Sequence, residues 1–219
     1  MDIDEQQNTE LPLGEQAYIR LRDLLRHGNL KSGQRLSESE ICDRFAMSRT
    51  PVREAIRRLQ SEGLLGSTPG GRIVVAEIDL ERVEEIYDMR EAVEGLAARL
   101  AARNARTPDL MRLEKILQEQ RAEPDTEVRF LNINDRFHGA IYTLSRNRYV
   151  IHDAEVLLNS ASMIRGSTHG RYDYESWSLQ DHEAIFNAIC NGDTAGAETA
   201  MRQHIRRGRW QRTRLLLAE

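Results

Sequence analysis

The sequence has few cysteines, few aromatic residues and no long apolar run. Its two cysteines, Cys42 and Cys190, lie far apart and in no metal-binding or redox spacing. This arrangement excludes a disulfide framework and a CxxC redox centre. Both cysteines have apolar-periodic neighbours, so we expect them to be small core side chains. No stretch approaches the roughly 20 apolar residues of a membrane-spanning helix, so no membrane partner is expected.

The beginning of the chain lacks the features of a targeting segment. Residues 1–7 are acidic and polar, whereas signal and transit peptides carry basic and apolar segments. We therefore expect a cytoplasmic protein with a mobile tail over residues 1–13. The length of 219 residues allows one medium domain or two small ones.

The net charge of −4 is unevenly distributed. Residues 1–75 carry equal numbers of basic and acidic side chains, so the negative excess belongs entirely to residues 76–219. From Ser48 to Arg72 basic residues predominate, with Glu54 and Glu62 opposed by Arg49, Arg53, Arg57, Arg58 and Arg72. A local basic patch on a neutral module is compatible with binding to phosphate groups.

Three helices followed by a hairpin are predicted in the first third of the chain. Helical apolar spacing from Gly14 to His27 predicts the first helix. Ser37, with Glu40 three residues later, has the pattern of a capping box and begins a short second helix. Ser48 is the expected N-cap of the third helix, with Pro51 in its first turn.

A Pro-Gly-Gly turn at residues 69–71 separates two short apolar segments that resemble strands. Two short capped helices before such a hairpin are typical of a winged helix-turn-helix, which we place at residues 14–76. From residue 79 onward the pattern is helical, with expected helices at 79–104, 108–122, 125–145, 148–166, 177–190 and 194–217. The fold class is therefore mainly α, with a C-terminal all-α antiparallel bundle over residues 79–217.

The third helix has the features of a DNA-reading element. Arg49 and Arg53 are four residues apart and share its exposed face. An arginine in the major groove can bind the O6 and N7 atoms of guanine with two hydrogen bonds. Ser48 and Thr50 can contact phosphates at the helix N-terminus, and the small Gly70 lets the wing approach DNA closely.

These residues resemble a known family. The pattern Gly28-x-Leu30-x-x-Gly33-x-x-Leu36-x-Glu38, followed by residues 48–64, is similar to the winged-helix domain of GntR-family regulators. The resemblance implies that Arg49 and Arg53 face bases and that Ser48, Thr50 and Gly70 contact DNA. Ser39 stands where better-known relatives carry a DNA-contacting arginine. Either the operator sequence differs from that of those relatives, or Arg35 or Arg44 supplies that charge.

Three histidines of the second domain are predicted to face one point. His182 and His204 lie eleven residues on either side of Asp193, in the turn between two expected antiparallel helices. At a rise of about 1.5 Å per residue, their rings should be level with each other. His138 has Asn134 one turn before it on the same face. The three imidazoles, with Asn134 as a neutral oxygen ligand or Asp135 as the alternative, suggest a divalent metal site.

The second domain also resembles a known group. Arg90-x-x-Val93-Glu94, Asn134-x-x-Phe137-His138, the block from Asp181 to Asp193 and Met201-x-x-His204 are similar to the FCD-type effector domain of the FadR-like branch. Metal-binding members of that branch use one aspartate and three histidines, and Asn134 replaces the aspartate here. Because imidazole is a favoured ligand of zinc, we expect zinc, with nickel or manganese as alternatives. The resemblance implies a small carboxylate effector, which Arg90 and Arg165 would bind unless they form salt bridges.

The sequence therefore predicts a DNA-binding regulator, not an enzyme. A homodimeric repressor reading a near-palindromic operator is the leading hypothesis, because paired half-sites require two-fold symmetry. One alternative is a metal-dependent hydrolase, for which Asp135 and Glu183 are the available acid–base residues. Another is a ligand-binding or interaction module without metal, in which the histidines belong to the core. The arginines from Arg202 to Arg214 are expected to form a solvated helix face.

Overall fold

The structure is a computed structural model that describes residues 11–122, 127–167 and 175–217. The chain divides into two compact units: the first runs up to Ile78 and also includes Ser162–Ser167, and the second contains the rest from Asp79 onward. We call the first unit the winged head and the second the helical unit. The predicted fold class is confirmed, because the head carries a small antiparallel sheet and the second unit is helical. Among the described residues, no helix is both long and apolar enough to cross a membrane.

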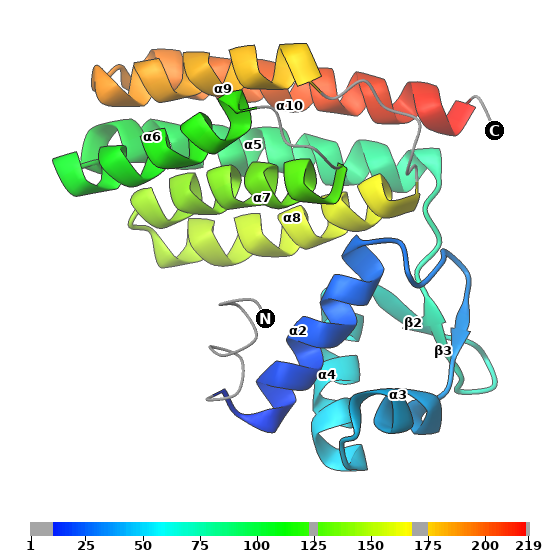
Figure 1. The fold of residues 1–219 in the computed structure, drawn as a ribbon. Helices are drawn as coiled ribbons and strands as arrows, with labels where there is room; N and C mark the ends of the chain where they lie inside the picture. The colour runs from blue at the N-terminus through cyan, green and yellow to red at the C-terminus, as the bar shows by residue number, and fades with distance from the viewer. Residues whose placement is uncertain (1–10, 123–126, 168–174, 218–219) are drawn as a thin grey trace. The chain divides into compact units, whose positions relative to one another are not determined.

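The winged head contains the three expected helices in the expected order (Figure 1). These are α2 (Leu13–Arg26), α3 (Glu38–Phe45) and α4 (Arg49–Ser61). Their apolar stripes form one core, in which Leu21, Leu25, Val52, Leu59 and Leu64 are at most 1% exposed. Helix α4 is thereby fixed through one face, which leaves its opposite face free.

The sheet of the head has one strand more than the sequence predicted. The hairpin strands β2 (Leu65–Ser67) and β3 (Ile73–Val75) pair antiparallel, as expected. Strand β1 (Arg35–Leu36) also pairs antiparallel with β3, which gives the order β1-β3-β2. Two residues are too few to show a periodicity, so only the pairing with β3 reveals β1.

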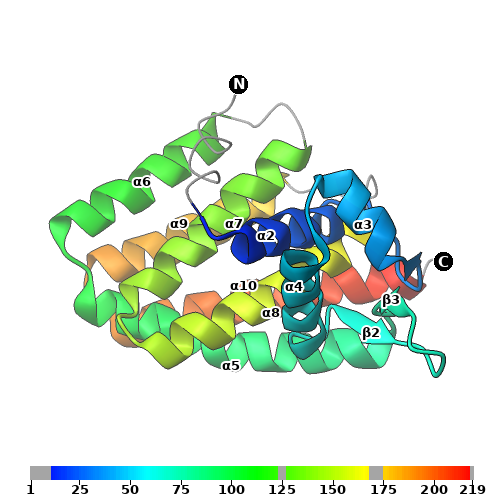
Figure 2. The same cartoon turned by 90° about the horizontal axis from the view of Figure 1, so that it is seen from below.

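The helical unit contains six described helices. They are α5 (Leu80–Asn104), α6 (Thr107–Arg121), α7 (Glu127–Leu144), α8 (Arg148–Ser167), α9 (Glu175–Cys190) and α10 (Thr194–Leu217). Helices α5 and α10 pack along each other (Figure 2). Buried alanines of α5, at positions 97, 98, 101 and 102, allow a close approach because they carry no bulky side chain.

The expectation that both cysteines are core side chains is wrong for one of them, and the arginines of α10 differ in their exposure. Cys190 is exposed, because it lies at the last residue of α9, where the apolar stripe ends. Cys42 is partly buried against the head core. The arginines of α10 are not simply solvated: Arg206 binds Glu91 of α5 at 2.6 Å, and Arg209 binds Asp88 at 2.6 Å. The face of α10 that they occupy is therefore an ion-paired seam with α5.

Candidate functional site

The exposed face of α4 carries most of the predicted DNA contacts. Ser48, Arg49, Thr50 and Arg53 are all exposed, whereas Pro51 and Val52 are buried. Ser48 occupies the N-cap position, but its side chain forms no capping hydrogen bond, contrary to the expected cap. Its hydroxyl is therefore available beside the free N–H groups of the helix start, where anions bind favourably.

The arginines of α4 differ in their contacts. Arg49 and Arg57 form no ion pair with another described residue, so their guanidinium groups are available to a partner. Arg53 instead donates from Nε to Glu38 Oε2 at 2.9 Å. This contact occupies one edge of the guanidinium group and leaves its terminal nitrogens to act as a fork.

Arg58 has a structural role within the head. It binds Glu15 of α2 at 2.7 Å and its guanidinium carbon lies 3.5 Å from the centre of the Tyr18 ring. It also contacts Glu62 at 3.2 Å, and Glu62 accepts a hydrogen bond from Tyr18 at 2.9 Å. The basic patch counted from the sequence therefore contains one arginine that joins α2 to α4.

The tip of the wing is built by glycines. The N–H of Gly71 donates to the carbonyl of Thr68 at 2.8 Å, which closes a tight turn through Pro69 and Gly70. Gly71 has a φ of 73°, a conformation that favours glycine. A Cβ at Gly71 would meet nothing within 4 Å, and Gly70 is exposed. The tip is thus open to an approaching backbone.

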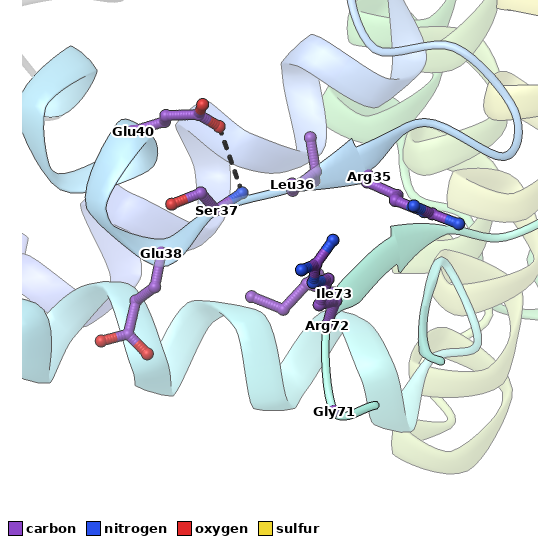
Figure 3. A pocket seen from close by; sticks show the side chains of 8 residues that line it. All are labelled: Arg35, Leu36, Ser37, Glu38, Glu40, Gly71, Arg72 and Ile73. Atoms are coloured by element: carbon purple, nitrogen blue, oxygen red, sulfur yellow. Dashed lines mark hydrogen bonds between the residues drawn. The ribbon is translucent and has the colours of Figure 1, made fainter. Parts of the chain in front are cut away.

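A groove of about 460 Å³ lies between the start of α3 and the wing (Figure 3). Arg35 and Arg72 line it, together with Ser37, Glu38 and Glu40. The backbone N–H of Ser37 donates to Glu40 Oε2 at 3.2 Å. Arg35, exposed on β1, was a predicted DNA contact. Arg72 was counted in the basic patch but was not among the predicted DNA contacts, and the β1–β3 pairing brings it to the same groove as Arg35.

The helical unit gathers three histidines at one buried point. His138 comes from α7, His182 from α9 and His204 from α10, and one ring nitrogen of each lies within 4.8 Å of the others. His138 Nε2 and His204 Nε2 are 3.3 Å apart. The rings of His182 and His204 are 4.8 Å apart between centroids, at the same level of the two helices. All three residues are buried.

Each histidine ring is oriented by a side-chain oxygen that lies near its Nδ1 atom. Nδ1 of His138 lies 2.7 Å from Glu94 Oε2, and Nδ1 of His182 lies 2.8 Å from Gln120 Oε1. Nδ1 of His204 lies 3.4 Å from Asp181 Oδ2. Because ionised carboxylates only accept hydrogen bonds, the Nδ1 atoms of His138 and His204 carry the protons. In the neutral rings the Nε2 lone pairs therefore face the shared point.

Burial keeps two of these rings neutral. It lowers the pKa of His182 well below its usual range, and the neighbouring His204 and His138 act in the same direction. Burial lowers the pKa of His204 to about 4, although the hydrogen bond and charge of Asp181 oppose this shift. At neutral pH both rings offer a free lone pair, so a metal ion need not displace a proton from either.

The donor set fits a metal ion. Zinc binds imidazole nitrogen at about 2.0–2.1 Å, so two nitrogens on a tetrahedral ion lie about 3.3–3.4 Å apart. The separation of 3.3 Å between His138 Nε2 and His204 Nε2 agrees with this value. His182 Nε2 is buried and has no hydrogen-bond partner among the described residues. Each Nδ1 contact also supplies the outer hydrogen bond that orients metal-binding histidines.

The predicted oxygen ligands have different positions. Asn134 is buried on α7, and its Nδ2 donates to Asp135 Oδ1 at 3.2 Å, which leaves the amide oxygen as an acceptor. Asp135 does not belong to the group of ligand atoms within 4.8 Å. Glu183 is bound by Arg121 at 2.8 Å. Neither carboxylate required by a hydrolase therefore lies within this histidine group.

The two predicted effector-binding arginines also differ. Arg90 is 3% exposed, and its Nε donates to Glu94 Oε1 at 2.6 Å. Burial alone would raise the pKa of Glu94, but Arg90, His138 and their hydrogen bonds outweigh it and lower that pKa. Arg90 thus supports His138 through Glu94, a role that the i,i+4 spacing of Arg90 and Glu94 could have indicated. The side chain of Arg165 lies outside the described residues.

Comparison with known proteins agrees with both units. Residues 13–75 match the family described as bacterial regulatory proteins, gntR family, and residues 85–207 match the FCD domain. This chain belongs to the GntR family. Within that family it combines the helix-turn-helix domain with an FCD domain, and it is a transcriptional regulator, not an enzyme.

Relatives of this GntR regulator span nearly its whole length. The HTH-type transcriptional repressor RspR of Escherichia coli (strain K12) is 29% identical over 94% of this chain and 91% of its own. A regulator from an unstable DNA locus of Streptomyces ambofaciens is 31% identical over 86% of this chain and 80% of its own length. The solved structure of E. coli McbR/YncC has a TM-score of 0.82 and 25% identity, over 92% of this chain and 98% of that chain.

Proposed function

We propose that this GntR regulator is a cytoplasmic repressor whose operator binding is controlled by a small organic acid at a metal centre. The observation that supports a metal centre is the convergence of three buried Nε2 atoms, each on a ring that is oriented through its Nδ1 atom. His138, His182 and His204 would hold the ion, with Asn134 as a fourth ligand. Zinc suits three imidazoles best, and nickel or manganese would also accept them. The acid would take the remaining positions on the ion.

We propose a homodimer that reads a near-palindromic operator. One head offers one recognition helix, and paired half-sites about one helical turn apart require a two-fold axis. In each head Arg49 and Arg53 would read base edges, while Arg35, Ser48, Thr50 and Gly70 would contact the DNA around them. The DNA-binding domain then covers residues 14–76 after a tail at 1–13, and residues 79–217 form the effector and dimerisation domain.

Binding of DNA and of the acid would be linked. If the acid changes the affinity of the protein for the operator, then the operator changes the affinity of the protein for the acid by the same factor. Such coupling free energies are typically about 1–3 kcal/mol, or about 5–150-fold in affinity. RspR is named a repressor, which favours that role for this relative.

The DNA-reading role is tested by Arg49→Ala. Arg49 is exposed and forms no ion pair with another described residue, so its loss removes a contact to DNA without disturbing the head. We expect specific binding to weaken by about 1–3 kcal/mol, with relaxed preference at one operator position. Fluorescence anisotropy with operator and random duplexes measures both. Arg112→Ala, an exposed arginine of α6, is the control. Equal weakening on both duplexes would make Arg49 a phosphate contact only.

The metal centre is tested by metal analysis of the purified protein. Protein prepared without added ions should contain about one divalent ion per chain, and a chelator should lower its melting temperature. Zinc returned to the metal-free protein at 100 times its Kd should stabilise the fold by about 2.7 kcal/mol. Protein that holds no ion and gains no stability from zinc, nickel or manganese would contradict the proposal.

A further inference from the structure

A second groove lies on the helical unit, between α6 and α7. Its volume is about 530 Å³, which is within the range of about 300–1,000 Å³ that is usual for small-molecule sites. Arg112 and Lys115 line it from α6, and Arg136 lines it from α7. No member of the histidine group and no predicted DNA contact lines it. The groove is therefore separate from the sites described above.

Gly139 lines this groove from α7 and has no packing reason within the described part of the chain. A Cβ at Gly139 would meet no neighbouring atom within 4 Å, and its φ is not positive. By contrast, a Cβ at Gly95 would lie 3.0 Å from the Arg202 side chain, and one at Gly208 would lie 3.4 Å from the Tyr87 side chain. Glycine destabilises a helix interior relative to alanine. A glycine on an open groove wall therefore indicates the close approach of a group from outside the chain.

The floor of the groove is apolar. Ile116 and Leu144 line it and are 5% and 6% exposed, so little of each side chain reaches solvent. Ala140, next to Gly139, adds a small apolar side chain. These two small residues leave the groove wide on the side of α7. An apolar group seated there would cover the remaining exposed surface of the floor and would be stabilised by leaving water.

Two ion pairs neutralise part of the charge around the groove. Arg136 binds Glu119 at 2.6 Å, and Arg146 binds Asp109 at 3.1 Å. Hydrogen bonding to Arg136 is the largest cause of the lowered pKa of Glu119, whereas Lys115 acts on that pKa only through its charge. Each of these two carboxylates is thus matched to an arginine of its own.

Arg112 and Lys115 leave an excess of positive charge at the groove. Both are exposed on α6, and neither forms an ion pair with another residue that the structure describes. Side chains three positions apart on a helix are neighbours, so the two cations border the same region of the groove. Two neighbouring cations beside an apolar floor favour a ligand that joins a doubly charged anion to an apolar body.

We propose that the groove binds an organic phosphate. The phosphate would lie between Arg112 and Lys115, and the apolar body would lie against Gly139 and Ile116. A phosphomonoester carries about two negative charges at neutral pH, whereas a simple carboxylate carries one. Arginine binds phosphate through its planar fork and lysine binds it as a point charge. The inference does not depend on the proposed metal centre, and changes in the groove should leave operator binding by the ligand-free protein intact.

The ligand class is tested by calorimetric titration of full-length protein with naphthyl phosphate. Inorganic phosphate lacks the apolar body, naphthol lacks the charge, and naphthoate carries one charge on the same ring. We expect naphthyl phosphate to bind at least about tenfold more tightly than each of these three compounds, because hydrogen bonds to charged groups and apolar burial both contribute. A chelator should leave this affinity unchanged.

The position of the ligand is tested by acetylation of lysines. The chain contains two lysines, Lys115 in the groove and Lys31, which is exposed in the winged head. Naphthyl phosphate at about ten times its Kd leaves about one site in ten empty and should slow acetylation of Lys115 about tenfold. Acetylation of Lys31 should keep its rate. Mass spectrometry of the digested protein measures both rates.

Two variants separate a ligand-binding role from a structural one. Gly139→Leu fills the groove and replaces glycine with a better helix former, so it should weaken naphthyl phosphate more than about tenfold without lowering the melting temperature. Ala184→Leu adds the same side chain at an exposed position of α9 and is its control. Lys115→Gln should weaken the ligand about tenfold, whereas Lys31→Gln should bind it normally.

The contrary results are specific. Naphthyl phosphate that binds no more tightly than naphthol or inorganic phosphate would overturn the ligand class. Binding that leaves Lys115 unprotected, or that a chelator abolishes, would place the ligand elsewhere and overturn the groove as its site. Wild-type affinity in both Gly139→Leu and Lys115→Gln would have the same meaning. A lowered melting temperature in Gly139→Leu would show that the chain itself requires Gly139, and Lys115→Gln would then decide the proposal.

Discussion

Glu94→Ala is expected to lower the free energy of unfolding by about 3–5 kcal/mol, the usual effect of breaking a buried ion pair. Glu94 is fully buried and accepts from Arg90 Nε at 2.6 Å and from His138 Nδ1 at 2.7 Å. The variant would leave the Arg90 guanidinium, itself 3% exposed, without its carboxylate. Urea denaturation of the metal-free protein, followed by circular dichroism, measures the change.

Glu119→Ala provides the control for this stability prediction. Glu119 also pairs with an arginine, Arg136, at 2.6 Å, but the Arg136 side chain is 51% exposed. Exposed pairs contribute about 0–1 kcal/mol, so this variant should unfold almost like the wild type. Equal losses for Glu94→Ala and Glu119→Ala would show that the buried pair has no special weight in stability.

The pH dependence of the Glu94 contribution follows from the direction of its shift. The pKa of Glu94 is lowered in the folded state, so its contribution is present above the unfolded carboxyl pKa of about 4.3. It is lost as the pH falls through the lower, folded value. The difference between wild type and Glu94→Ala should therefore persist at pH 5 and shrink in stronger acid.

His204→Ala is expected to weaken zinc binding by more than about 100-fold and to remove the response of DNA binding to the acid. Loss of a residue that only hydrogen-bonds to a metal ligand already lowers metal affinity about 10–100-fold. His204 is a proposed direct ligand, so its loss should have a larger effect. The winged head contains none of the three histidines, so operator affinity without the acid should stay unchanged. Zinc competition with a chromophoric chelator and DNA anisotropy measure the two effects.

His152→Ala is the matched control for the metal prediction. His152 is exposed on α8 and lies outside the histidine group. Acidification should imitate the loss of His204, since the pKa of His204 is lowered to about 4 and the ring becomes protonated below that pH. Wild-type zinc affinity in His204→Ala would mean that the three histidines are core residues.

The sequence alone predicted the elements and the histidine convergence for local reasons. Capping residues and apolar periodicity are encoded within a few positions, so the winged head and the helical unit could be predicted. The equal spacing of His182 and His204 from Asp193 placed both rings at one level, because two antiparallel helices share their turn. The centroid separation of 4.8 Å agrees with that reasoning.

Tertiary structure alone decided which groups surround those histidines. Gln120 contacts His182 across 62 positions, and Glu94 contacts His138 across 44. Such contacts depend on the rotation and axial register of packed helices, which periodicity does not specify. The same holds for the pairing of β1 with β3, which brings Arg35 and Arg72 to one groove. Local sequence thus determined the elements and the metal-binding residue types, while packing determined the hydrogen-bond partners of those residues.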